Sequence, residues 1–113
     1  MSKITIITCT YNSEEFIEQT LKSIYSQKFM DFEHIIVDNL SSDNTRKIIN
    51  KNYFHNRILI SEKDKGIYDA FNKGILKSSG EIIGFLHSSD FYQRNDYLDN
   101  VIDAFKKTDC DIL

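Results

Sequence analysis

Side chains that could bind a metal ion or a polar ligand gather in the loops after four short apolar stretches of this chain. Asp38 directly follows one of these stretches, and Asp90 lies in the loop after another. Carboxylate oxygens are favoured ligands of Mg²⁺ and Mn²⁺, and they accept hydrogen bonds from the hydroxyl and N–H groups of ligands. These loops therefore hold the residues with which the chain could do chemistry.

The four apolar stretches have the composition of buried strands. They are short, they are rich in β-branched residues, and the chain has no proline to interrupt them. The first reads Lys-Ile-Thr-Ile-Ile-Thr-Cys, and the second stops at Asp38. The predicted strands cover residues 3–9, 32–37, 57–60 and 81–86.

A helical spacing of apolar residues follows each predicted strand. Asn12 and Glu15 have the spacing of a capping box, which predicts a helix from there to about Lys28. Residues 41–43 would cap a second helix, and Gly80 is predicted to end the third. The apolar stripes consist of Ile17, Leu21, Ile24, Ile48, Ile49, Ile67, Phe71, Ile75, Leu98, Val101, Ile102 and Phe105.

Strands and helices alternate along the whole chain. This order predicts an α/β fold in which βαβ units form a mostly parallel sheet with helices on both faces. In such a sheet, ligands bind beyond the carboxyl ends of the strands, where the loops described above lie. Residues 109–113 have the pattern of an opening fifth strand, so we expect residues 1–113 to be one incomplete domain, truncated after the fourth βα unit.

The composition limits the class of partner. With 14 basic and 17 acidic residues the net charge is -3, which argues against a nucleic-acid-binding surface. No apolar run is long enough to cross a membrane and no signal peptide precedes the first strand, so a cytoplasmic location is expected. Cys9 and Cys110 form no C-x-x-C pair and are interpreted as buried thiols.

Several enzyme classes lack their sequence signatures here. Neither G-x-G-x-x-G after the first strand nor G-x-x-x-x-G-K-[ST] occurs, which disfavours dinucleotide oxidoreductases and P-loop phosphohydrolases. A receiver domain would carry acidic residues at the end of its first strand, where Thr8, Cys9 and Thr10 stand. A nucleotidyltransferase would have a glycine-rich, basic first loop, which Thr10-Tyr11-Asn12 is not.

Five segments carry motifs that run in order through nearly the whole chain: residues 6–12, 26–38, 41–45, 64–74 and 80–90. The first is Ile-Ile-Thr-Cys-Thr-Tyr-Asn, and the fourth contains Gly-Ile-Tyr-Asp-Ala-Phe-Asn-Lys-Gly. In sequence and spacing, the five segments resemble the successive blocks of family 2 glycosyltransferases with the Rossmann-like GT-A fold. The fourth is most similar to enzymes that build bacterial surface polysaccharides such as colanic acid or O-antigen.

The resemblance implies transfer of a sugar from a nucleotide-sugar, with a UDP-sugar as the expected donor. Negative charge develops on the leaving nucleoside diphosphate, and a divalent cation, Mn²⁺ or Mg²⁺, would neutralise it. By the family's D-x-D-like motif, Asp90 is the expected metal ligand, with Ser88 and Ser89 beside it at the donor. Ser89 replaces one of the usual acids, and the alternative for Asp90 is a cap of the turn before Phe91.

The same resemblance assigns the nucleotide to the loops after the first two strands. Thr10, Tyr11 and Asn12 form the expected base-binding corner, in which the Tyr11 ring covers the pyrimidine, and Asn12 could also serve as the helix cap. Asp38 is expected near the uracil or the ribose, with Asn39 next to it, and the alternative for Asp38 is a plain turn acid.

Further donor contacts are expected around the third helix. Lys65, Asp69 and Asn72 would form one wall of the donor pocket at its N-terminus; the alternatives are a solvated cation and an exposed helix face. Glu14 matches an acidic position of the family, or favours the first helix dipole as a solvated acid. His87 is expected to line the pocket. The residues of the third helix interpreted as core are Tyr68, Phe71 and Ile75.

These features predict the donor-binding half of an inverting glycosyltransferase whose acceptor is a saccharide or a lipid-linked saccharide. The whole protein could then lie peripherally at the inner membrane face. The catalytic base and the acceptor site are expected beyond residue 113, so this chain alone should bind donor and transfer nothing. The single carboxylate at Asp90 leaves one alternative open, a non-catalytic module that binds nucleotide-sugars.

Overall fold

The computed structural model describes residues 2–108, in which four parallel strands form one sheet. The strands are β1 (Ile4–Thr10), β2 (Phe32–Asp38), β3 (Arg57–Ser61) and β4 (Ile82–Phe85). Their order across the sheet is β3-β2-β1-β4, so β1 and β2 are central and are paired in register from Ile4 and Phe32 onward. The expected parallel α/β sheet is confirmed, and the predicted strand ends differ from the observed ones by a single residue.

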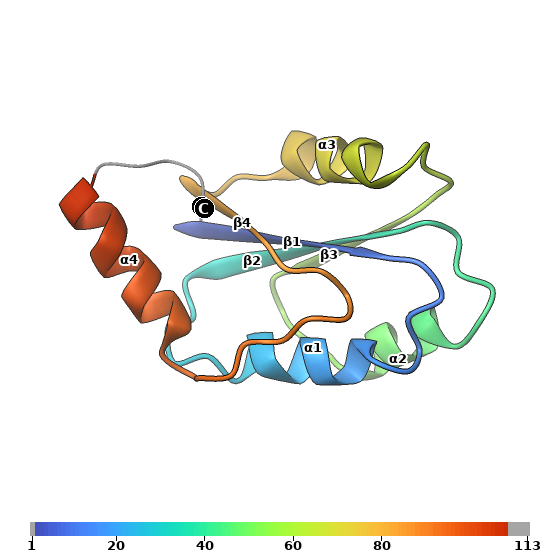
Figure 1. The fold of residues 1–113 in the computed structure, drawn as a ribbon, viewed down its shortest axis with the longest axis horizontal. Helices are drawn as coiled ribbons and strands as arrows, with labels where there is room; N and C mark the ends of the chain where they lie inside the picture. Colours follow the sequence, from blue (N-terminus) through green and yellow to red (C-terminus); the bar gives the residue numbers. More distant parts are fainter. Residues whose placement is uncertain (1, 109–113) are drawn as a thin grey trace.

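Four helices cover the two faces of this sheet: α1 (Ile17–Tyr25), α2 (Thr45–Lys51), α3 (Ile67–Lys77) and α4 (Tyr97–Thr108). Figure 1 shows α3 over one face and α1 with α2 along the other, as the sequence predicts. None of the helices within residues 2–108 is long and apolar enough to cross a membrane. The fifth strand predicted at residues 109–113 lies outside the described residues.

The core lies in two layers because successive residues of a strand point to opposite faces. Every residue of β1 and β2 is buried. Ile4 and Ile6 pack with the α4 residues Leu98 and Val101 on one face, whereas Ile7 packs with residues of α3 on the other. Two central strands buried on both faces explain why their sequences are nearly continuous apolar and β-branched runs.

Helix α3 approaches the sheet closely because small residues face it. Ala70 and Gly74 are its buried residues, and a Cβ atom on Gly74 would lie only 2.6 Å from Cγ2 of Ile7. The larger side chains are displaced from this contact: Tyr68 is 81% exposed and Ile75 is 40% exposed, and Phe71 is partly buried. The prediction that Tyr68 and Ile75 belong to the core is therefore wrong.

The predicted capping box at Asn12 and Glu15 is also wrong. Helix α1 begins at Ile17, and its N-cap residue makes no side-chain capping bond. Asn12 instead adopts the left-handed conformation with φ 46°, and its side chain binds another loop. The cap of α2 was predicted at residues 41–43. Of these, Asp43 caps the helix, since its Oδ1 accepts a 2.9 Å hydrogen bond from the N–H of Thr45.

Gly80 does not end α3, which stops three residues earlier at Lys77. It lies instead against the start of β1, where its N–H donates a 2.8 Å bond to Oγ1 of Thr5. A Cβ atom on Gly80 would meet the Thr5 backbone nitrogen at 2.5 Å. Gly80 therefore allows the close approach of the chain that leads into β4.

Candidate functional site

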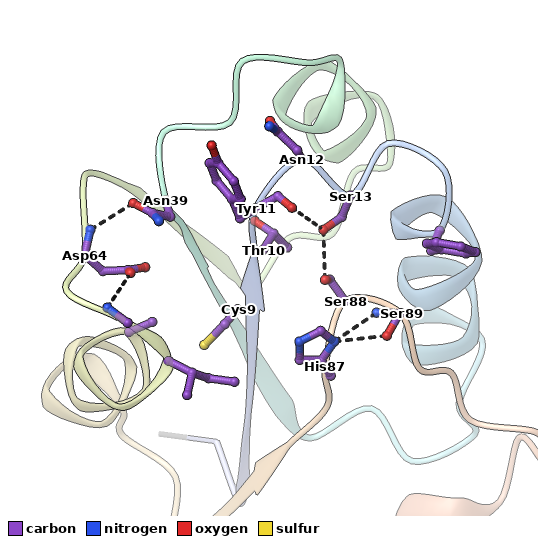
Figure 2. A pocket seen from close by; sticks show the side chains of 14 residues that line it. Cys9, Thr10, Tyr11, Asn12, Ser13, Asn39, Asp64, His87, Ser88 and Ser89 are labelled. Atoms are coloured by element: carbon purple, nitrogen blue, oxygen red, sulfur yellow. Dashed lines mark hydrogen bonds between the residues drawn. The ribbon is translucent and has the colours of Figure 1, made fainter.

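A cavity of about 410 Å³ opens at the carboxyl ends of β1 and β4, beside the first residues of α3. This is the edge at which ligands bind in open parallel sheets. Figure 2 shows side chains from several loops converging on it. The lining residues are Cys9, Thr10, Tyr11, Asn12, Ser13, Phe16, Asn39, Asp64, Gly66, Ile67, Ala70, His87, Ser88 and Ser89.

The loop after β1 presents an aromatic ring and is held by the loop after β2. Tyr11 is 60% exposed and lines the cavity, which leaves a ring face open to a ligand. The left-handed turn at Asn12 brings its Oδ1 within 2.8 Å of the Ser42 N–H, which donates to it. The Asn12 N–H donates in turn to Oγ of Ser41 at 2.9 Å. These reciprocal bonds fix the backbone that carries Tyr11.

Asp38 lies beneath this loop and does not line the cavity. Its carboxylate is fully buried and accepts hydrogen bonds from Oγ1 of Thr10 at 2.7 Å and from the N–H of Ser41 at 2.9 Å. The hydroxyls of Ser41 and Ser61 donate to it as well. The observed contacts of Asp38 therefore hold the ends of β1, β2 and β3 together, and they differ from the expected contact with a base or a ribose.

Asp64 is a pocket residue that the sequence reasoning missed. Its backbone N–H donates a 2.9 Å bond to Oδ1 of Asn39, and its own Oδ1 accepts a 3.0 Å bond from the Gly66 N–H. Since Oδ1 of Asn39 is occupied, the amide NH₂ of Asn39 is the group left for a ligand. The pair therefore offers a donor and an acceptor side by side. Its sequence signals were its position in the loop after the third strand and at the start of the family-like segment 64–74, neither of which was assigned to Asp64 itself.

Cys9 lines the floor of the cavity as a neutral thiol. Burial, together with the nearby Asp64 carboxylate, raises the pKa of this thiol to about 12. A thiol with so high a pKa is a poor nucleophile and a poor metal ligand near neutral pH. The interpretation of Cys9 as a buried structural residue is confirmed, and Cys110 lies outside the described residues.

The loop after β4 is anchored to α1 and to the loop that precedes it. The Ser88 and Ser13 hydroxyls are hydrogen bonded at 2.9 Å, and Oγ1 of Thr20 donates to the backbone oxygen of Ser88 at the same distance. His87 lines the cavity, as expected, with its Nδ1 against Ser89. The backbone of the predicted metal motif is thus held firmly in place.

The Asp90 side chain is exposed and does not line the cavity in this conformation. Within residues 2–108 there is no group of three or more His, Cys, Asp or Glu residues that could hold a metal ion. Mg²⁺ in nucleotide sites is often bound by one or two carboxylates, with substrate phosphates and water completing its shell. The Asp90 carboxylate makes no side-chain bond within the described chain. A single carboxylate fits this mode of binding, but it does not make a site in which the protein supplies all the ligands.

Four other predicted site residues lie outside the cavity lining: Glu14, Lys65, Asp69 and Asn72. Oε2 of Glu14 accepts a 3.2 Å bond from the N–H of Asn44, and Asn72 is exposed on α3. The Lys65 N–H donates to the Asp69 carboxylate, and this bond, with the charge of Lys73, lowers the pKa of Asp69. Asp69 therefore caps the first turn of α3 from within.

Of the predicted nucleotide residues, the structure brings together Thr10, Tyr11, Asn12, Asn39, Ser88 and Ser89. Besides Asp64 and Cys9, it adds residues that the sequence reasoning did not assign to the site, namely Ser13, Phe16, Gly66, Ile67 and Ala70. Phe16 precedes α1, where the wrong capping prediction had placed a helical turn. Gly66 is the N-cap residue of α3, and Ile67 and Ala70 belong to its first turn, so this end of the helix borders the cavity.

The sequence of the chain is similar to that of a known protein family. The model of the family described as "Glycosyl transferase family 2" matches residues 5–113. The UDP-Glc:alpha-D-GlcNAc-diphosphoundecaprenol beta-1,3-glucosyltransferase WfgD of Escherichia coli is 33% identical over 93 residues, which are 81% of this chain and 37% of that protein. The chain spans 34% to 43% of the length of the first curated relatives that it matches.

Solved structures share the fold. The S. aureus TarS 1-349 structure in complex with UDP-GlcNAc is 27% identical with a TM-score of 0.84, covering 93% of this chain and 31% of that one. The mannosyltransferase PcManGT of Pyrobaculum calidifontis, in complex with GDP-Man and Mn²⁺, is 26% identical with a TM-score of 0.85, covering 91% and 32%. The expected Rossmann-like GT-A arrangement is therefore confirmed.

Proposed function

The chain belongs to glycosyl transferase family 2, and on that premise we propose that it forms the donor-binding part of an inverting glycosyltransferase. The donor is a UDP-sugar and the product a bacterial surface polysaccharide of the colanic acid or O-antigen kind. The observation that carries the proposal is the cavity at the carboxyl edge of the sheet, which combines an exposed ring at Tyr11 with the N-terminal end of α3.

Each part of a nucleotide-sugar has a counterpart in this cavity. The Tyr11 ring would stack on the base, and the amide of Asn39 with the carboxylate of Asp64 would hydrogen bond to its edge. A uracil edge presents an acceptor next to a donor, which complements that pair. The diphosphate would lie at the N-terminus of α3, beside Gly66 and Ile67, where the helix dipole favours negative charge.

A divalent cation, Mn²⁺ or Mg²⁺, would neutralise the diphosphate as it leaves. Asp90 would contribute the protein ligand, and oxygens of the donor and water would complete the shell. The Mn²⁺ in the similar PcManGT complex supports a cation, although it is a property of that protein. The bonds from Thr20 and Ser13 hold the backbone of the loop that carries Asp90, and the Asp90 side chain would turn toward the cavity to reach the cation.

In the proposed reaction an acceptor hydroxyl attacks the anomeric carbon of the sugar, and the bond from that carbon to the phosphate oxygen breaks with inversion. A carboxylate beyond residue 113 would take the proton of the hydroxyl, so residues 1–113 alone would not transfer sugar. The full name of WfgD includes a saccharide linked to diphosphoundecaprenol, which supports a lipid-linked acceptor. The whole protein would then work in the cytoplasm, peripheral to the inner face of the membrane.

A second candidate is a non-catalytic module that binds nucleotide-sugars. It is favoured by the lone carboxylate at Asp90 and by the lack of a three-ligand cluster within the described residues. The two candidates differ in one measurable property. Nucleotide binding by the transferase depends on Mn²⁺ through Asp90, whereas nucleotide binding by the module does not.

The proposal is tested by thermal unfolding of the chain with UDP, GDP and CMP, each with and without Mn²⁺. A ligand that binds only the folded state stabilises it by about 2.7 kcal/mol at one hundred times its Kd. We expect the largest rise in Tm with UDP and Mn²⁺ together, and loss of the Mn²⁺ dependence in Asp90→Asn. Asp103→Asn serves as the matched control, because Asp103 is an exposed acid on α4. No rise in Tm with any nucleotide would contradict the proposed function.

A further inference from the structure

The two ring nitrogens of His87 have different environments. The backbone N–H of Ser89 approaches Nδ1 at 3.3 Å, and Oγ of Ser89 lies 3.1 Å from the same nitrogen. A backbone N–H can only donate, so Nδ1 must be the acceptor. With Nδ1 unprotonated, the ring hydrogen sits on Nε2. The turn after β4 therefore selects one tautomer of His87.

The protonated nitrogen is directed into the site. Figure 2 shows the second ring nitrogen turned away from Ser89, toward the side of the cavity that Cys9 lines. The His87 side chain is exposed, and Nε2 makes no hydrogen bond to any residue of the described chain. Nε2–H is therefore a fixed, unused donor that faces the space a ligand would occupy.

A donor at this place matters because no lysine or arginine among residues 2–108 lines the cavity, while Asp64 adds a negative charge. Lys65 is adjacent in sequence but does not line the cavity. A nucleoside diphosphate bound there would find few protein groups to balance its charge besides the backbone N–H groups at the start of α3. Hydrogen bonds to charged acceptors are stronger than those between neutral groups.

We propose that His87 is a binding and catalytic residue that donates a hydrogen bond from Nε2 to the diphosphate of the donor. This inference rests on the proposed function, since it places a diphosphate in the cavity. As the bond between the anomeric carbon and the phosphate oxygen breaks, the electron pair remains on that oxygen. The Nε2–H stabilises the resulting charge and is not transferred. His87 is not a metal ligand in this arrangement, because Nε2 carries the ring proton and the lone pair of Nδ1 accepts the hydrogen bond from the Ser89 N–H.

The chain allows a matched set of variants at this position. In His87→Asn the amide occupies the place of Nδ1 and retains the turn contact but does not reach the cavity. In His87→Gln the longer amide places an NH₂ group near the position of Nε2. His87→Ala removes both groups. His55→Asn, an exposed histidine outside the cavity lining, is the control.

The experiment is calorimetric titration of each variant with UDP and with uridine, both in the presence of Mn²⁺. We expect His87→Ala and His87→Asn to lose about tenfold or more in UDP affinity, as for a hydrogen bond to a charged group. His87→Gln should stay within about threefold of the original chain. Uridine affinity should be unchanged in all variants, since uridine has no phosphate.

The outcomes separate the two proposals. If UDP binds all His87 variants equally, the role of His87 is refuted while the proposed function stands. An equal loss for UDP and uridine would also refute it, because a merely structural residue would weaken both. If the original chain binds no UDP, both proposals fall. Nitrogen-15 NMR of the unliganded chain adds an independent test, since a proton on Nδ1 of His87 would overturn the tautomer argument.

Discussion

At the scale of single residues, the site divides into polar groups that are satisfied within the fold and polar groups that face the cavity. Asp38 belongs to the first kind, with its carboxylate bonded to Thr10, Ser41 and Ser61. His87 and Asn39 belong to the second, each with one atom held by the loops and one left open. The first kind fixes the backbone, and the second kind meets the ligand.

This division predicts a stability effect for Asp38→Asn. An amide NH₂ at Oδ2 would oppose the fixed Ser41 N–H, and at Oδ1 it would force the Thr10 and Ser41 hydroxyls to reorient, while either placement removes the charge that these groups donate to. We expect a loss of about 3 kcal/mol in the free energy of unfolding, measured by urea denaturation. The exposed Asp103→Asn should change it by less than about 0.5 kcal/mol. Equal stability of the two variants would contradict the positional role of Asp38.

The sequence predicted the polar residue types at the strand ends but not which of them are buried. Both Asp38 and Asp64 are strand-end acids on parallel strands, and only the three-dimensional path of the loops decides that Asp64 reaches the cavity. The same holds for Asn12. Its spacing predicted a helix cap, but in its left-handed conformation its side chain accepts a hydrogen bond from Ser42 and links the loops after β1 and β2. Such links depend on residues about thirty positions apart, which local spacing does not encode.

At the scale of elements, the cavity depends on how closely α3 lies on the sheet. Gly66, Ile67 and Ala70 of this segment line the cavity, and Gly74 sets its distance from β1. Helical periodicity predicted that α3 exists but assigned its large residues to the core, because periodicity alone does not show that a helix packs through its small residues. The strands were predicted more accurately than the helices, because strands buried on both faces consist mainly of β-branched and apolar residues, a pattern that the sequence shows directly.

Gly74→Ala tests this close approach. The new Cβ would lie 2.6 Å from Cγ2 of Ile7, a buried β-branched side chain with little rotamer freedom. The overpacking cost of about 1–3 kcal/mol should outweigh the gain in helix propensity of about 1 kcal/mol. We expect a lower Tm and weaker UDP binding, as α3 moves outward.

Gly84→Ala is the control for that substitution. A Cβ atom at Gly84 would meet no heavy atom of residues 2–108 within 4 Å, so Tm should stay the same or rise slightly. A Gly74→Ala protein as stable as the original chain would show that α3 can shift at no cost, which would contradict the account of its packing.

At the scale of the whole molecule, the buried polar network beneath the sheet gives stability a defined pH dependence. His34 is fully buried between Thr8 and Tyr25, and burial, with the nearby Arg57 charge, lowers its pKa to about 3. The unfolded chain has the ordinary histidine pKa of about 6.5. Between these values the unfolded state binds the extra proton, so stability falls as the pH falls.

We therefore expect the free energy of unfolding to decrease by up to about 1.4 kcal/mol per pH unit as the pH falls below about 6.5, from this residue alone. The range above about pH 5.5 largely separates it from protonation of carboxylates. Urea denaturation at a series of pH values measures the slope, and His55→Gln should leave the slope unchanged. An imidazole NMR signal of His34 that titrates near pH 6.5 in the folded protein would refute the prediction.

The central claim is that this cavity binds a nucleoside diphosphate together with a divalent cation. The most direct measurement is paramagnetic broadening of backbone amide NMR signals by Mn²⁺, with and without UDP. The account predicts that, only when UDP is present, signals of Ser88, Ser89, Asp90, Gly66 and Tyr11 broaden, while those at the opposite edge of the sheet, at Ile4 and Phe32, broaden far less. Broadening that is absent with UDP, or that centres on another surface, would contradict it.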